Sequence, residues 1–84
     1  MSDQEGTTAE EVLLYLIAQL VEHPDQGELE IEESDTKISL MAKVSSEDIG
    51  RVIGKRGRVA NSIRTLVRAA AVKDGVDVEV DFSD

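Results

Sequence analysis

The chain contains no cysteine, no tryptophan, one proline and only two aromatic residues, Tyr15 and Phe82, among 84 residues. Without thiols, neither a disulfide nor a thiolate-ligated metal can support the fold, which must depend on a compact apolar core or a partner subunit. His23 is the only histidine, and no nucleophile or acid–base constellation surrounds it in the sequence. We therefore expect neither an enzyme nor a bound metal or cofactor, and the length allows one domain.

Long hydrophobic runs are also missing. The longest in the first predicted helix covers residues 12–18, whereas a membrane span needs about 20 apolar residues. The N-terminus is acidic and lacks the basic start of a signal peptide. The absence of cysteine is compatible with a reducing cytosol, and we expect a soluble cytoplasmic protein with residues 1–6 disordered.

Charge is strongly segregated along the chain. The net charge is −9, yet residues 51–73 hold seven basic residues and no acidic one. All eighteen acidic residues lie elsewhere, accompanied only by Lys37 and Lys43. Such a basic island in an acidic chain indicates a site for an anion. The alternative is that acidic segments fold against the island and neutralise it.

Hydrophobic periodicity predicts six elements. They are a helix from Thr7 or Thr8 to His23, strands at 28–32 and 38–44, a short helix from Ser45 or Ser46 to Ile53, a helix at 58–73 and a strand at 76–82. Apolar and polar residues alternate in every strand, so each has one buried and one wet face. This predicts an α+β two-layer sandwich, a three-stranded sheet with helices on one face. Leu66 is expected to be buried, and Tyr15 is expected in or beside the core.

The segment Gly54-Lys55-Arg56-Gly57 joins the second and third predicted helices. Glycines allow a sharp turn and a close approach to a ligand backbone. The next helix begins at Arg58, where free N–H groups and the helix dipole favour an anion. The combination suits nucleic-acid phosphates, whereas an ordinary interhelical turn is the alternative interpretation.

Two further features surround this segment. Asn61, Arg64 and Arg68 recur at helical spacing and share one side of the third predicted helix. A solvated face that pairs with acidic neighbours explains them equally well. Nucleotide motifs do not fit, because a P-loop needs four residues between its glycines followed by Lys-Ser/Thr, and G-x-G-x-x-G is absent.

Residues 49–60, IGRVIGKRGRVA, resemble the core of a KH domain, and residues 61–71, NSIRTLVRAAA, are similar to the stand-alone bacterial KH proteins of the KhpA type. The resemblance covers residues 8–82 and implies the type II KH arrangement, helix-strand-strand-helix-helix-strand, with 7–84 as a single KH domain. Its loop would clamp the backbone of single-stranded RNA.

The resemblance also implies residue roles. Lys55 and Arg56 would face phosphates, and Gly54 and Gly57 would allow close approach. Arg58 adds a further positive charge at the same place and is counted among the RNA-binding residues. One wall of an apolar base groove would consist of Ile49, Val52 and Ile53, although core packing of some of them is equally compatible. The second strand, residues 38–42, would form the opposite wall. From the polar side of the third predicted helix, Asn61 and Arg64 are also counted among the RNA-binding residues. Two aromatic residues are too few for a stacking platform, which favours weak, unspecific binding.

At the level of function, the resemblance implies an RNA chaperone or post-transcriptional regulator. It also implies self-association or pairing with a second KH protein of the KhpB (Jag) type. The alternative is a protein-interaction or structural KH domain that binds RNA only together with a partner, because the chain outside residues 51–73 is so acidic.

Overall fold

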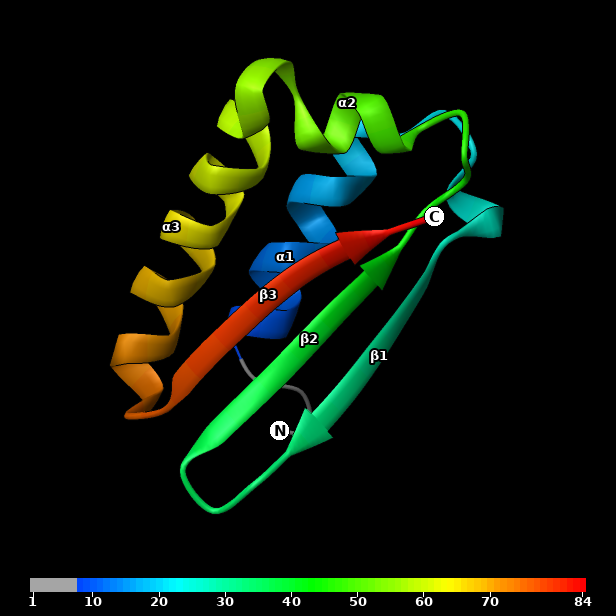
Figure 1. Ribbon diagram of the computed structural model, residues 1–84. Helices are drawn as coiled ribbons and strands as arrows, with labels where there is room; N and C mark the ends of the chain where they lie inside the picture. Colours follow the sequence, from blue (N-terminus) through cyan, green and yellow to red (C-terminus); the bar gives the residue numbers. More distant parts are fainter. Residues whose placement is uncertain (1–7) are drawn as a thin grey trace.

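The computed structural model describes residues 8–84, and the expectations for residues 1–6 and for a helix cap at Thr7 lie outside this range. The order of elements is the predicted one (Figure 1). The elements are α1 (Thr8–Leu20), η1 (Pro24–Gln26), β1 (Glu28–Glu33), β2 (Lys37–Lys43), α2 (Ile49–Ile53), η2 (Lys55–Gly57), α3 (Arg58–Asp74) and β3 (Asp77–Ser83).

The three strands form one sheet in the order β1-β2-β3. β1 pairs with β2 antiparallel, as expected for a hairpin, whereas β2 and β3 are parallel. Parallel neighbours need a crossover connection, and α2 and α3 provide it. α1 and α3 lie on the same side of the sheet, which confirms the two-layer α+β sandwich (Figure 1). None of the helices described is long and apolar enough to cross a membrane.

The core lies between the helices and the inner face of β2 and β3. Alternate strand residues such as Leu40 and Val80 are 2% exposed, and they pack with Leu13 of α1 and Val67 of α3, both fully buried. This alternation confirms the predicted period of two for these strands. α3 ends where Gly75 adopts the left-handed conformation and donates hydrogen bonds to the carbonyls of Ala71 and Val72, as expected for a helix C-terminus.

Three burial predictions were wrong, each at the edge of the helical layer. Tyr15 is 65% exposed and Leu66 is 52% exposed, because they lie on the outer sides of α1 and α3. On β1, Leu29 is half-buried, but Ile31 is 43% exposed although its partner Leu40 is buried. The helical layer therefore covers β2 and β3 and leaves most of the inner face of β1 open.

Candidate nucleic-acid interface

The connection between α2 and α3 has an unusual backbone conformation. Gly54 has φ 77° and ψ 173°, Arg56 has φ 58° and ψ 26°, and Gly57 has φ 74° and ψ 13°. Arg56 is the only residue other than glycine with positive φ in the described part of the chain. Left-handed backbone is costly for residues with a Cβ atom, so this loop holds local strain of a kind that often marks binding sites.

The two glycines of the loop differ in the space that is available for a side chain. A Cβ atom on Gly54 would lie 2.4 Å from Cγ2 and 2.9 Å from the backbone nitrogen of Val59. A Cβ atom on Gly57 would have no heavy atom within 4 Å. Gly54 is therefore required by the packing of the loop on α3, whereas Gly57 leaves open space through which a ligand can approach the backbone.

The basic residues of the loop are exposed and form no ion pairs within residues 8–84. They are Lys55, Arg56 and Arg58. The ion pairs of the sheet use other residues: Lys37 Nζ lies 3.1 Å from Glu79, and Lys43 Nζ lies 3.0 Å from Glu30. In the part of the chain described, the acidic residues therefore do not neutralise the loop. Its charge faces solvent beside the first turn of α3, where the helix dipole favours an anion, although the N–H groups of Gly57 and Arg58 already donate to carbonyls of the loop.

The three apolar residues predicted for the groove separate into two groups. Ile49 and Ile53 are partly exposed, and Ile49 also packs against the core cluster. Val52 is fully buried within the core cluster. Val52 therefore takes the core-packing role, which the sequence had left open, and it fixes α2 to the body of the domain.

The strand beside α2 and α3 is β3, and the expectation that β2 forms the wall opposite α2 was wrong. Ile38, Leu40 and Ala42 of β2 are at most 7% exposed and belong to the interior. β2 is the central strand, whereas β1 and β3 are the two edge strands, and β3 is the one that packs against α3. The accessible surface across from α2 and α3 therefore belongs to β3.

Arg64 and Asn61 connect α3 to this edge. Arg64 Nε donates a hydrogen bond to the Val80 carbonyl oxygen at 2.9 Å, and Nη1 donates to Asn61 Oδ1 at 2.9 Å. The guanidinium also lies 5.4 Å from the centroid of the Phe82 ring and 3.8 Å from Asp81 Oδ1. Arg64 thus has partners within the domain, as the acidic-neighbour interpretation expected, while Arg68 is exposed and forms no ion pair within residues 8–84.

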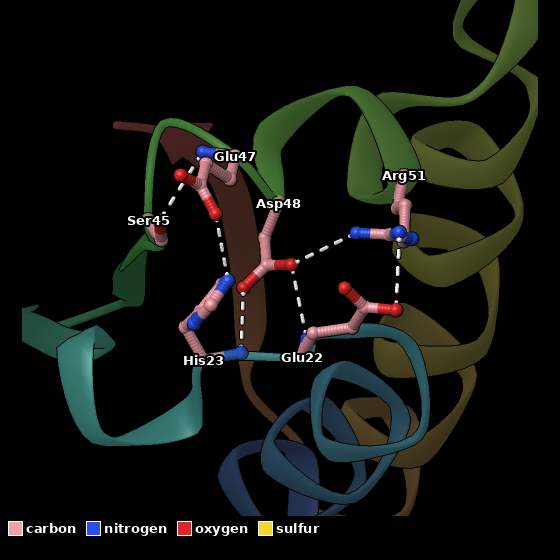
Figure 2. Close-up of polar contacts among 6 residues, drawn as sticks. All are labelled: Glu22, His23, Ser45, Glu47, Asp48 and Arg51. Carbon is pink, nitrogen blue, oxygen red and sulfur yellow. Dashed lines mark hydrogen bonds and ion pairs between the residues drawn. The ribbon is translucent and has the colours of Figure 1, made fainter.

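The opposite end of α2 contains a buried carboxylate. A helix that starts at Ser45 or Ser46, as predicted, would place Asp48 in its first turn. α2 instead begins at Ile49, and Asp48 is fully buried. Its Oδ1 accepts the N–H of Glu22, and its Oδ2 accepts the N–H of His23, both at 3.0 Å (Figure 2). Arg51 Nη1 lies 3.1 Å from Oδ1. The Glu22 N–H, followed by the His23 N–H and the nearby positive charge, lowers the pKa of Asp48.

The residues around Asp48 complete a bridge between α2 and the turn after α1. Arg51 Nη2 lies 3.2 Å from Glu22 Oε2, and His23 Nε2 lies 2.8 Å from Glu47 Oε1 (Figure 2). The Glu47 N–H donates to Ser45 Oγ, so this serine supports the turn before α2. Arg51, counted with the basic island from its sequence position, is therefore held by two carboxylates. Asp48 and Arg51 are three residues apart, but nothing in that spacing distinguishes a buried pair from a surface pair.

The fold and the loop together define the class. A helix-strand-strand-helix-helix-strand order, a sheet with β2 parallel to β3 and a Gly-x-x-Gly connection between α2 and α3 are those of a type II KH domain. A model of the KH domain of KhpA/KhpB matches residues 10–82. The chain belongs to this family.

Known proteins agree with that assignment. RNA-binding protein KhpA of Bacillus subtilis is 40% identical over 84 residues, which cover all of both chains. RNA-binding protein KhpA of Listeria monocytogenes is 43% identical over 73 residues, which cover 87% of this chain and 96% of the relative. A crystal structure of an Era variant from Aquifex aeolicus, bound to GDP·AlF4⁻, matches 89% of this chain and 30% of that one with a TM-score of 0.62. At 19% identity, that likeness concerns the fold alone.

Proposed function

We propose that this protein binds single-stranded RNA without catalysis, and that residues 54–57 clamp the RNA backbone. The observation that carries the proposal is the set of three exposed cations, Lys55, Arg56 and Arg58, which have no ion-pair partner within residues 8–84. They lie in and beside a loop with two glycines of positive φ, directly before a helix of 17 residues. The name of the relatives, RNA-binding protein KhpA, supports the same function.

The geometry suggests how such a clamp works. Phosphates meet the loop cations at the positive end of the α3 dipole, and Gly57 lets the RNA backbone come close. Bases then lie between Ile49 and Ile53 on one side and the edge of β3 on the other. Of the two aromatic residues, Tyr15 belongs to α1, which is not part of the loop, and the Phe82 ring already faces the Arg64 guanidinium. Aliphatic contacts therefore hold the bases, which favours weak and unspecific binding, as suits an RNA chaperone or post-transcriptional regulator in the cytoplasm.

Pairing with a second KH protein is part of the proposal. α3 exposes two apolar side chains, Leu66 by 52% and Val72 by 74%, about 120° apart around the helix, and exposed apolar residues of this kind support a contact with a partner. The partner is a second copy of this chain or a KhpB (Jag)-type protein. Light scattering should give a mass above that of a monomer at high micromolar concentration, alone or after mixing with the KhpB-type protein. A monomer in both cases would contradict the pairing.

Fluorescence anisotropy with labelled single-stranded RNA tests the clamp. Contacts with three or four phosphates predict a slope of about −2 to −3 in log affinity against log salt concentration. Replacing Lys55 and Arg56 by Gln should weaken binding and make the slope shallower by about 1.4, because each lost phosphate contact contributes about 0.7.

The matched control replaces Arg68 and Lys73 by Gln, which removes the same charge from exposed residues of α3 away from the loop. It should bind nearly as the unmodified protein does. Equal losses in the two variants would show that net charge, and not the loop, determines affinity. Binding of RNA only in the presence of a KhpB-type protein would instead favour the partner-dependent alternative.

A further inference from the structure

β1 has an open hydrogen-bonding edge. Within residues 8–84 it pairs only with β2, and it lies at the side of the sheet away from α3 (Figure 1). The six residues of β1 therefore present a row of backbone N–H and C=O groups on their outer side. Such an edge is a template for another extended chain unless the protein covers it.

Beside this edge, the inner face of β1 is apolar and uncovered. Ile31 is 43% exposed and Leu14, on α1, is 51% exposed. Between α1 and β1 lies a hollow of about 220 Å³, lined mainly by apolar residues that include Leu14, Val21 and Leu29. This volume is below the roughly 300 Å³ at which pockets hold drug-sized molecules. The hollow suits one or two apolar side chains of a segment that lies along the strand.

The outer face of β1 determines the charge of such a segment. Glu28, Glu30 and Glu32 alternate with Leu29 and Ile31 and are exposed. Of these three, only Glu30 forms an ion pair within the described residues, with Lys43. A second copy of β1 would place carboxylates opposite carboxylates, which is destabilising, and RNA would be repelled. Basic residues on the added chain would be attracted.

We propose that β1 binds an extended segment of a partner protein in which apolar and basic residues alternate, as a fourth strand of the sheet. Apolar side chains of this segment would enter the hollow beside α1, and basic side chains would face the glutamates. This is the geometry of recognition by β-augmentation. The protein's own residues 1–7 include Asp3 and Glu5 and no basic residue, so their composition does not match. The site is separate from the RNA loop.

The first test uses synthetic peptides and ¹⁵N-labelled full-length protein. A short peptide that alternates valine with lysine should shift amide signals of β1 and of the facing side of α1. A scrambled peptide of the same composition should bind at least about tenfold more weakly, because a change of pattern moves apolar side chains to the wrong face. A peptide with glutamate in place of lysine should not bind. Equal binding of the scrambled peptide would reduce the effect to charge attraction and overturn the proposal.

The second test separates strand pairing from simple insertion of side chains into the hollow. Two versions of the alternating peptide carry N-methyl groups on odd or on even residues, which blocks one edge or the other while leaving the side chains unchanged. One version should lose binding and the other should keep it. In the protein, Ile31→Lys should weaken peptide binding and leave RNA affinity unchanged. Similar affinity of both methylated peptides, or no effect of Ile31→Lys, would contradict β-augmentation.

Discussion

The two ends of α2 differ in almost every physical respect. At its N-terminal end, the Asp48 carboxylate is fully buried and is satisfied by two backbone N–H groups and Arg51. At its C-terminal end, Lys55 and Arg56 are exposed and form no ion pair within residues 8–84. One end joins the helix to the turn after α1, and the other end presents charge to solvent.

This difference explains how a helix of only five residues can present a binding loop. A helix so short is not stable by itself, so its position depends on tertiary contacts. Val52 holds the middle of the helix in the core, and Asp48 holds its start. With these contacts in place, Arg56 can keep a strained left-handed conformation. The anchored end therefore makes the geometry of the exposed end possible.

The largest effect is expected at the loop, from Gly54→Ala. Gly54 has a conformation that is essentially restricted to glycine, with a strain of about 1–3 kcal/mol for other residues. The added Cβ would also overlap Val59. We expect a loss of about 3 kcal/mol or more in the free energy of unfolding, measured by urea denaturation.

Gly57→Ala is the matched control for this variant. Gly57 has a left-handed conformation, which other residues adopt at a cost of about 1–2 kcal/mol, and its Cβ would meet nothing. The variant should stay folded and bind RNA less well, because the methyl group enters the space left for the ligand. Equal destabilisation by both substitutions would remove the distinction between a packing glycine and a contact glycine.

A smaller effect on stability is expected at the N-terminal end of α2, when Asp48 is protonated at low pH. The pKa of Asp48 is lowered below its ordinary value of 3.8 in the folded state, chiefly by the Glu22 N–H. Because the folded state holds the proton less tightly than the unfolded state, this carboxylate contributes stability above pH 3.8, and the contribution is lost as pH falls through its folded pKa. Asp48→Asn should be less stable than the unmodified protein at pH 7.

Urea denaturation of both proteins between pH 7 and pH 2 checks this expectation. The difference in stability between them should be largest near neutral pH and should narrow in the acid range, where Asp48 itself becomes protonated. A difference that stays constant over the whole range would mean that the charge of Asp48 does not support the anchor.

The same two ends show what the sequence could and could not predict. The loop could be proposed from the sequence because glycine spacing and a cluster of cations are local features, whereas the absence of ion pairs at these cations is seen only in the structure. The anchor was missed because its donors, the N–H groups of Glu22 and His23, are 25 or 26 residues away from Asp48. An acidic residue before a helix fits an exposed first turn equally well, and no local pattern shows its burial.

The strands follow a similar rule. Alternation predicted which faces of β2 and β3 are buried, because α1 and α3 cover both strands. It failed for Ile31, since the coverage of an edge strand depends on how many helices the layer contains. The order of strands in the sheet also decides which strand lies across from α2 and α3. β3 is the edge beside α3 because it pairs with β2 and not with β1, and this pairing joins segments far apart in the chain.

The smallest effect on the free energy of unfolding is expected from Arg56→Gly. This variant should be more stable than the unmodified protein, whereas the other variants should be less stable. Glycine relieves a left-handed strain of about 1–2 kcal/mol but increases the entropy lost on folding by about 0.5–1 kcal/mol. A net gain of about 0.5 kcal/mol in stability should result, together with weaker RNA binding from the loss of one cation. Arg56→Ala removes the same charge and keeps the strain, so it should bind RNA equally weakly while being less stable than the glycine variant. If Arg56→Ala instead bound RNA more tightly than Arg56→Gly, the fixed left-handed geometry of residue 56, and not its charge alone, would contribute to the clamp.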